Sequence, residues 1–247
     1  MSKQNVLFRD LGRLAYKDAW DFQEKLLQET VGVKAAIRTM EDQQDFNTGE
    51  LETRHHLLFV EHPPVYTLGK SGHMENVLLS EEALKQRGID FYRANRGGDI
   101  TFHGPGQIVG YPILDLEKFY TDIGRYLRNI EEVIIRVLAD YGITSGRSAG
   151  ETGVWLDADK KGFERKICAI GVRSSRWVTM HGFAFNVNTD LDYFNYIIPC
   201  GIQDKQVTSL EKELGRKVSM EEVKEKVKHY FEEIFDVQLV SFISSSQ

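Results

Sequence analysis

The run from Arg96 to Gln107 reads RGGDITFHGPGQ and places four glycines, a proline, an arginine and a histidine within twelve positions. Glycine is costly inside helices and strands, so clustered glycines indicate a backbone in special dihedral angles or pressed against a ligand. The apolar segment Ile108 to Leu114 follows directly and is typical of a strand. The pattern predicts a loop and a strand that line a binding site.

A second candidate is Cys200, which stands between Pro199 and Gly201. Proline and glycine on either side favour a turn, and a thiol held on a tight turn is well placed to act as a nucleophile. The alternative is a small buried hydrophobe, which is how most free cysteines behave. Cys168 lies in the apolar stretch Ile167 to Ile170, where the buried interpretation is favoured.

A nucleophilic thiol needs a neighbour that promotes its ionisation. His103 and His181 are both expected in glycine-rich turns, and Lys166 stands at the start of a strand-like segment. The alternative for Lys166 is a charge on the solvated surface. For His181 the alternatives are a structural histidine and a thiol-protease-like dyad with Cys200, and the structural histidine is favoured. Spacing alone does not bring Lys166 to Cys200.

The bulk composition narrows the class of protein. The chain has 247 residues, a net charge of −6 and two cysteines. These values argue against a general nucleic-acid binder, a disulfide framework and a zinc site. We expect a cytoplasmic protein without a membrane span, because the N-terminal segment resembles neither a signal nor a transit peptide and no apolar stretch approaches about 20 residues.

The known cofactor motifs do not fit. Gly69-Lys70-Ser71 resembles the end of a phosphate-binding loop, but Pro64 stands where that motif needs glycine. Gly104, Gly106 and Gly110 miss the dinucleotide spacing by one residue, and there is no HExxH. The sequence therefore predicts neither a cofactor nor a metal.

The elements that must position these residues follow from periodicity. We expect helices near both proline-free ends, a polar loop from Glu41 to Thr53, and a buried strand from His56 to Val60. A further helix over 126–141 should end at Gly142. Short strands are expected at 153–156, 167–172, 177–180 and 183–187, and a C-terminal helix should begin with the capping box Ser219 to Glu222. The simplest fold is a single α+β domain over residues 1–247.

Five blocks together resemble the octanoyltransferases of lipoate biosynthesis, the LipB family. They are the run from Arg96 to Gln107, Gly153 to Trp155, Lys166 to Gly171, Trp177 to Asn186, and Pro199 to Gly201 followed by Val207 to Leu210. The blocks stand in the family's order between residues 57 and 210. Phe102 and Phe185 depart from the family's common tyrosine and leucine, and both changes are conservative.

The resemblance implies a fold like the catalytic domain of biotin and lipoate ligases, a mixed sheet with helices on one side. It implies that octanoyl-acyl carrier protein donates an octanoyl group to a lysine of a lipoyl domain, as in 2-oxoacid dehydrogenase E2 subunits and the glycine cleavage H protein. Cys200 would carry the acyl thioester, and Lys166 would lower the pKa of that thiol and then move the proton. The implied acyl site comprises Arg96, Gly97, Gly98, Asp99, Ile100, Thr101, Phe102, His103, Ala169, Ile170, Gly171, Gly182, Phe183 and Ala184.

Other functions remain open beside this one. An ATP-dependent lipoate or biotin ligase would share the fold but would need an adenylate-binding loop and no cysteine. A close variant would move octanoyl between two lipoyl-domain proteins. A thiol hydrolase would use Cys200 with His181, and a non-catalytic acyl-binding or carrier-binding module would need neither.

Overall fold

The computed structural model describes residues 3–43, 51–198 and 206–241. Within these ranges, eight strands form one mixed sheet in the order β10-β8-β9-β6-β2-β1-β11, and β7 pairs with β8 beside that path. The β1/β2, β1/β11 and β8/β10 pairs are parallel, and the other pairs are antiparallel. The strands are β1 (Gln4–Arg13), β2 (His55–Glu61), β6 (Gln107–Ile113), β7 (Val154–Leu156), β8 (Arg165–Ser175), β9 (Val178–Asn186), β10 (Gln206–Val207) and β11 (Val237–Ser241).

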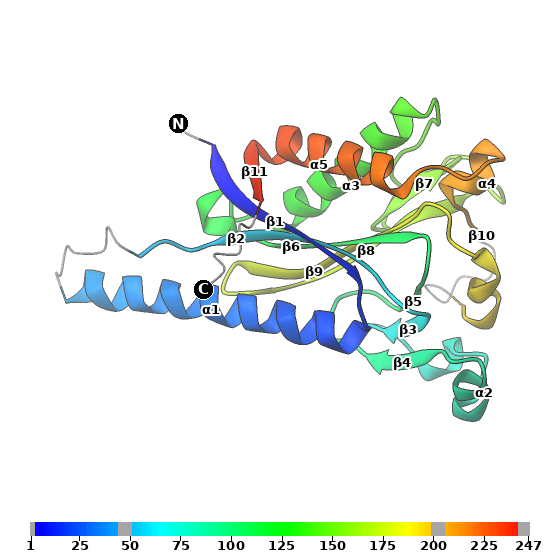
Figure 1. The fold of residues 1–247 in the computed structure, drawn as a ribbon, viewed down its shortest axis with the longest axis horizontal. Coiled ribbons are helices and arrows are strands. Elements are labelled where there is room, and N and C mark those ends of the chain that lie inside the picture. Colours follow the sequence, from blue (N-terminus) through cyan, green and yellow to red (C-terminus); the bar gives the residue numbers. More distant parts are fainter. Residues whose placement is uncertain (1–2, 44–50, 199–205, 242–247) are drawn as a thin grey trace.

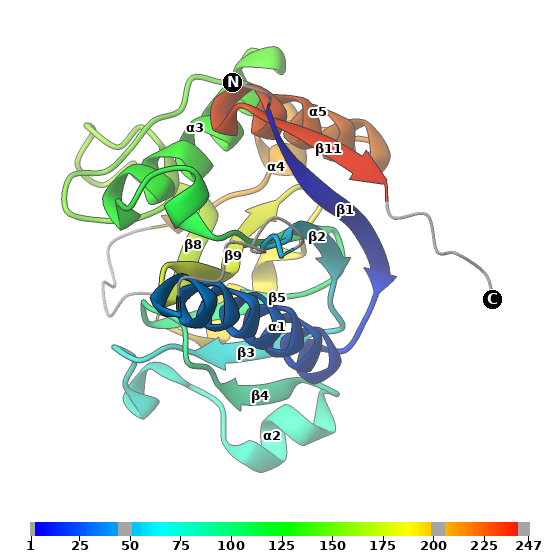
Figure 2. The ribbon, with the colours of Figure 1, turned by 90° about the vertical axis from the view of Figure 1, so that its left-hand side faces the viewer.

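Long helices cover both faces of this sheet (Figures 1 and 2). Because side chains alternate along a strand, Leu57 of β2 packs in the cluster with α3 (Ile123–Asp140) and α5 (Met220–Phe235), whereas Leu58 packs in the cluster with α1 (Tyr16–Asp42). The predicted α+β class with a mixed sheet is confirmed. The expectation of helices on one side is wrong, since the central strands bury apolar side chains in both directions.

The helix expected near the N-terminus is α1, and its buried face includes Ala19, Gln23 and Leu27 at helical spacing. Towards its C-terminal end the buried Lys34 forms ion pairs with Asp115, which follows β6, and with Glu117 at 3.0 Å. These contacts fix the far end of α1 against the sheet. The helix ends within the predicted polar loop, whose residues 44–50 lie outside the described part of the chain.

The helices on the other face begin and end largely where the sequence predicts. Asp122 caps α3 by accepting a hydrogen bond from the amide of Arg125 at 2.9 Å, and Gly142 follows α3 with a φ of 72°. Ser219 caps α5 by accepting from the amide of Glu222 at 3.3 Å. The Glu222 carboxylate accepts from the hydroxyl of Tyr141 at 2.9 Å, so it ties the end of α3 to the start of α5.

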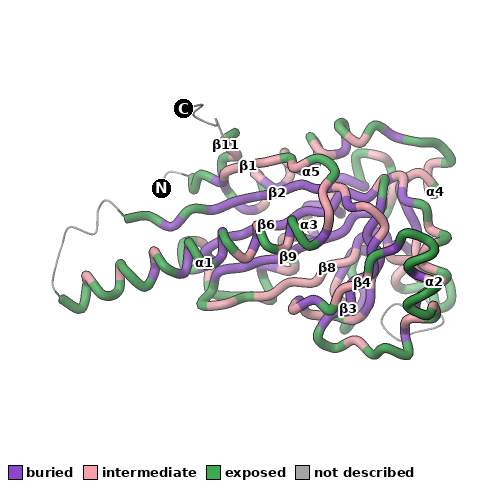
Figure 3. Tube along the Cα trace, turned by 60° about the horizontal axis from the view of Figure 1, so that its bottom comes forward, coloured by how far each residue is buried: buried purple, intermediate pink, exposed green. Residues whose placement is uncertain are grey.

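A second, three-stranded sheet in the order β4-β3-β5 lies below the main one and was not predicted. Its apolar side chains, including Tyr66, Leu68 and Phe102, form a separate cluster under α2. Figure 3 shows exposed segments of this part of the chain around the buried strand β3. The elements are β3 (Val65–Leu68), β4 (Asp90–Arg93), β5 (Ile100–His103) and α2 (Glu81–Gln86); α4 (Leu210–Leu214) and 3₁₀ turns at Met74–Asn76, Leu116–Lys118 and Leu191–Tyr196 complete the fold.

Two further expectations are corrected by the strands. Both proline-free ends carry a strand as well as a helix, because β1 precedes α1 and β11 follows α5. The strands expected at 177–180 and 183–187 are one strand, β9, which pairs with β8 along its whole length. His181 therefore lies inside a strand with a φ of 57°, not in a turn, and His103 is the last residue of β5. The buried strand predicted over 56–60 is confirmed as β2.

Candidate active site

The loop that carries Arg96 packs directly onto β8. The amide of Gly97 donates to the carbonyl of Val172 at 2.9 Å. Opposite it, a Cβ on Gly171 would approach the carbonyl oxygen of Gly97 to 2.8 Å, closer than real Cβ contacts. Glycine at 171 is therefore needed for this close approach of two backbones.

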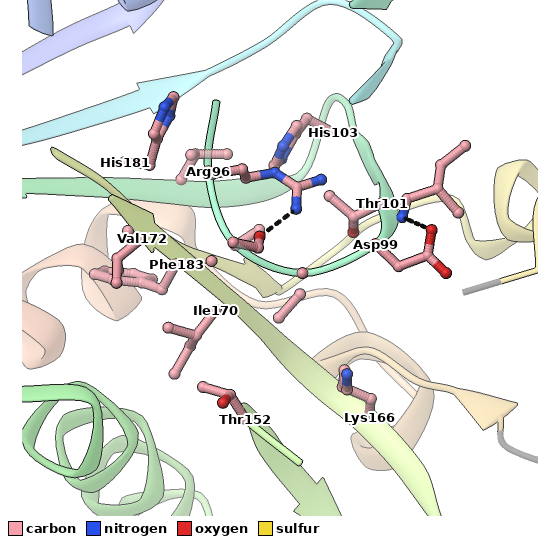
Figure 4. Close-up of a pocket in the computed structure, with 18 of the residues that line it drawn as sticks. Arg96, Asp99, Thr101, His103, Thr152, Lys166, Ile170, Val172, His181 and Phe183 are labelled. Carbon is pink, nitrogen blue, oxygen red and sulfur yellow. Dashed lines mark hydrogen bonds between the residues drawn. The ribbon is translucent and has the colours of Figure 1, made fainter. Parts of the chain in front are cut away.

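A cavity of about 600 Å³ lies between this loop and strands β8 and β9. Its size suits a small ligand or an acyl chain. Figure 4 shows the side chains that line it. Thirteen of the fourteen residues predicted for the acyl site line the cavity: 96–101, His103, 169–171 and 182–184.

Phe102 is the exception among the predicted acyl-site residues. Thr101 and His103 on either side of it line the cavity, and alternate side chains of a strand point to opposite faces. Phe102 instead stacks on Tyr193, with ring centroids 4.5 Å apart, and is 1% exposed. It supports the wall from behind.

Lys166 also lines the cavity, near the start of β8. Its Nζ lies 4.5 Å from the ring centroid of Trp155 on β7, within the range of a cation–π contact. On its other side Lys166 pairs with Val207 of β10, which is another lining residue. Figure 4 places Lys166 and His181 at opposite ends of the side chains drawn.

Cys200 lies outside the described residues, which resume at Gln206. The described residue before the gap, Ile198, is linked through Asn76 to Asp99, which lines the cavity. The amide of Ile198 donates to the carbonyl of Asn76 at 2.9 Å, and the side chain of Asn76 donates to Asp99 at 2.7 Å. Cys168 is fully buried in the core, and this burial raises the pKa of its thiol far above the usual range, so it is held as a neutral thiol.

A chain of hydrogen bonds through Thr67 joins the Arg96 guanidinium to a neutral His103. The Arg96 guanidinium donates to the backbone and hydroxyl oxygens of Thr67, at 2.5 and 2.9 Å from Nη2. His103 Nδ1 donates to the Gln107 side-chain oxygen at 2.9 Å, which leaves Nε2 to accept from the Thr67 hydroxyl at 3.3 Å. Burial, with His62 and Arg96 nearby, holds the pKa of His103 well below its usual range.

His181 is held in a similar neutral state. It is 1% exposed, and its Nε2 lies 2.6 Å from the side-chain oxygen of Asn95. Burial, followed by the charges of Arg96 and Arg173, lowers its pKa to about 3. An imidazole with that pKa is a weak base at neutral pH, so these contacts favour the structural interpretation of His181 over a catalytic dyad.

Several lining residues escaped the sequence analysis. Leu127 comes from α3 and Tyr16 from α1, and in the sequence each is one apolar or aromatic position on a helical face. Gln107 is the last residue of the glycine-rich run, and Asn186 is the last residue of the block that contains His181. Their positions in these motifs could have predicted that they line the cavity. Val109 and Val172 are two further apolar lining residues that were not predicted.

Two negative findings apply to the part of the chain that the structure describes. No group of three or more histidine, cysteine or acidic side chains is arranged to hold a metal ion. None of the described helices is both long enough and apolar enough to span a bilayer.

Comparison with known proteins decides the family. A family model described as the lipoyl protein ligase A/B catalytic domain matches residues 15–232. The chain is 58% identical over 240 residues to an octanoyltransferase of Christiangramia forsetii, covering 97% of this chain and 99% of that protein. The chain belongs to the octanoyltransferases of the lipoyl protein ligase A/B family. An octanoyltransferase of Parabacteroides distasonis is 50% identical, over 94% of this chain and 99% of its own length. The similarity thus extends into the first 50 residues, beyond the span from 57 to 210 that the motifs covered.

Solved structures show the same fold at low identity. A bipartite lipoate protein ligase from Thermoplasma acidophilum superposes with a TM-score of 0.66 at 18% identity, covering 99% of this chain and 88% of that chain. A lipoate-protein ligase A bound with ATP gives 0.65 at 16% identity, covering 99% and 90%. The predicted likeness to the lipoate ligase catalytic domain is confirmed.

Proposed function

We propose that residues 1–247 act as one catalytic domain that transfers an octanoyl group from acyl carrier protein to a lysine of lipoyl domains, such as those of 2-oxoacid dehydrogenase E2 subunits and the glycine cleavage H protein. Cys200 carries the octanoyl group as a thioester between the two partners. The observation that carries this proposal is that Lys166 lines the same cavity as apolar side chains such as Val109 and Ala184. An acyl chain fills the apolar part, and its carbonyl lies beside Lys166.

The first step exchanges one thioester for another. The Cys200 thiolate attacks the octanoyl carbonyl, and the C–S bond to the carrier breaks as the tetrahedral intermediate collapses. The leaving carrier thiolate takes a proton from the Lys166 ammonium, which leaves Lys166 neutral for the second step. The ammonium of Lys166 favours the thiolate form of Cys200 by charge. Its contact with the Trp155 ring and its place on a paired strand hold that ammonium in position.

The second step forms the amide. The lysine amine of the lipoyl domain attacks the Cys200 thioester, the C–S bond breaks, and the Cys200 thiolate leaves. The attacking nitrogen loses a proton, which Lys166 accepts when it is neutral. The thioester is already activated, so the reaction consumes no ATP.

A test begins with the acyl-enzyme itself. Purified protein is mixed with octanoyl-acyl carrier protein without ATP and analysed by intact mass spectrometry. The octanoyl increment is expected on the wild type and on Cys168→Ala, which removes the other thiol, and should be absent from Cys200→Ala. Addition of a lipoyl domain should discharge it.

Two results would overturn the proposal. Full transfer by Cys200→Ala would exclude the thioester intermediate. A lipoyl domain modified only when ATP and free octanoate are supplied would assign the chain to the ligase reaction, which the shared fold also accommodates.

A further inference from the structure

The side-chain amide of Asn186, at the end of β9, joins the glycine-rich run to the segment that follows β10. Its oxygen accepts a hydrogen bond from the Gln107 side chain at 2.9 Å, and its nitrogen donates to the carbonyl oxygen of Thr208 at 3.0 Å. Asn186 is 3% exposed and Gln107 is 1% exposed. A buried polar group that loses its partner costs free energy, so these two hydrogen bonds fix Thr208 relative to the glycine-rich run.

The orientation of both amides is determined by their neighbours. The Gln107 nitrogen also donates to the backbone carbonyl of Phe102 at 3.1 Å, and the Gln107 oxygen accepts from His103 at 2.9 Å. A backbone carbonyl can only accept, so the nitrogen of each amide must face it. Asn186 is therefore held in one orientation, with its donor aimed at Thr208.

Thr208 in turn lies directly beside Lys166. The amide of Thr208 donates to the backbone carbonyl of Lys166 at 2.9 Å, and Thr208 is fully buried. The Thr208 hydroxyl donates to Glu213 at 2.6 Å, and Glu213 also accepts from Arg165 at 2.7 Å. Asn186 therefore acts on the backbone of Lys166 through one intervening residue.

A second side-chain amide, that of Asn76, joins the same glycine-rich run to the chain just before residue 199. It donates to the carboxylate of Asp99 at 2.7 Å, and Asn76 is 7% exposed. The backbone around Asn76 pairs with the other segment through two hydrogen bonds of 2.9 Å, from Ile198 to the carbonyl of Asn76 and from Leu78 to the carbonyl of Tyr196. Asn76 thus holds Ile198 in place relative to Asp99.

Ile198 precedes Cys200 by two residues in the sequence, so the position of Ile198 limits where Cys200 can lie. Asn76 therefore acts on the side of Cys200, and Asn186 acts on the side of Lys166. Both are bonded to residues of one glycine-rich run. Because the attraction between an ammonium and a thiolate weakens with distance, a shift of either segment changes how strongly Lys166 stabilises the thiolate.

We propose that Asn76 and Asn186 are positioning residues, which hold the segments of Cys200 and Lys166 against the same wall and so set the distance between the thiol and the ammonium. This inference rests on the proposed thioester mechanism. It assigns the alignment of that pair to two buried side-chain amides, each acting through a hydrogen-bonded neighbour.

The test measures the pH profile of Cys200 alkylation by iodoacetamide, which needs no acyl donor. Asn76→Ala and Asn186→Ala should each move the profile towards higher pH, and neither shift should exceed that of Lys166→Ala. In the Lys166→Ala background the same two substitutions should cause no further shift, because the ammonium through which they act is gone. In the transfer assay each single variant should lower kcat by about 10- to 10²-fold, since a misplacement of about 1 Å can cost that much.

The matched control is Asn188→Ala, two residues beyond Asn186. The Asn188 side chain also donates to a backbone carbonyl, that of Val218, at 2.8 Å, and it does not line the cavity. Its loss should leave the alkylation profile unchanged in both backgrounds. Thermal unfolding of all variants separates a loss of stability from a loss of alignment.

The outcomes separate this inference from the proposed function. A variant whose profile coincides with that of Asn188→Ala, or shifts equally with and without Lys166, overturns the positioning role of that residue. A wild type that forms no octanoyl adduct overturns the proposed transfer, while the alkylation profiles still decide whether the two amides align the thiol and the ammonium. If Asn186→Ala does not fold, Asn76→Ala in the two backgrounds decides.

Discussion

Lys166 is assigned two tasks, and these can be separated by substitution. Lys166→Arg keeps a positive charge at this position but replaces the amine with a guanidinium, which does not act as a proton acceptor. Lys166→Ala removes both. Because Cys168 is fully buried, alkylation of the native protein should report on Cys200 alone.

We expect both Lys166 variants to lose transfer activity by about 10²-fold or more, the usual effect of losing a general acid or base. In Lys166→Ala the pH profile of Cys200 alkylation should move towards higher pH, and in Lys166→Arg it should stay close to that of the wild type. Peptide mapping after iodoacetamide treatment provides the measurement. An unshifted profile in Lys166→Ala would contradict the electrostatic task.

Sequence motifs predicted some of the residues that line the cavity and missed others. The glycine-rich run and the blocks at 166–171 and 181–186 supply most of the wall because neighbours on a strand or tight loop share a surface. Leu127 and Tyr16 reach the cavity only through helix packing, which no local pattern encodes. Phe102 is misassigned because a motif names all its positions, whereas strand alternation turns every second side chain away.

At the scale of elements, Glu131 connects α3 to the cavity. Its carboxylate is fully buried and accepts from Arg128 at 2.6 Å, from Arg147 at 2.9 Å and from the amide of Gly153 at 3.0 Å. The loop between Arg147 and Gly153 includes lining residues 150–152 and leads into β7. Glu131 thus fixes the segment that leads to Trp155, whose ring contacts Lys166.

Glu131→Gln should therefore weaken both stability and transfer. Weakened hydrogen bonds to a buried polar group cost about 1–3 kcal/mol of unfolding free energy, and a displacement of about 1 Å can cost up to 10²-fold in rate. Urea denaturation and the transfer assay provide the two measurements. The matched control, Glu132→Gln, removes a carboxylate that is 33% exposed and pairs with Arg136 and Arg147, so it should cost less than about 1 kcal/mol. Equal effects of the two substitutions would refute the special role of Glu131.

Helices and buried strands were the predictable elements, and the sheet edges were not. The helices α1, α3 and α5 repeat apolar residues with helical spacing, and β2 carries the continuous apolar run from Leu57 to Val60. By contrast, β1 has a single fully buried side chain, Val6, and β11 spans five residues. The two strands pair with each other, with Gln4 opposite Val237. Local periodicity cannot predict a partner so far away in the sequence.

Across the whole molecule, buried histidines should make stability depend on pH. Burial is the first cause that lowers the pKa of His55, His56 and His62 to about 4, and that of His181 to about 3. An unfolded histidine titrates near 6.5. Between about pH 6.5 and 4 the unfolded chain binds protons that the folded protein does not, so the free energy of unfolding falls as the pH falls.

At pH 5 each such histidine should lower the free energy of unfolding by up to about 2 kcal/mol. Together they are comparable to the whole stability of a typical domain, about 5–15 kcal/mol. Urea denaturation between pH 7.5 and 5 tests this expectation. His62→Gln should make the dependence less steep, and His229→Gln, at a side chain that is 70% exposed, should leave it unchanged. A flat profile in the wild type would contradict the assignment.

The pairing of β1 with β11 has a consequence for synthesis on the ribosome. Strand β1 needs residues 237–241 as one of its two neighbours. At about 5–20 residues per second, that neighbour is synthesised on the order of tens of seconds after β1. Throughout that interval the nascent chain presents β1 as an open edge, available to chaperones or to another nascent chain, until β11 pairs with it.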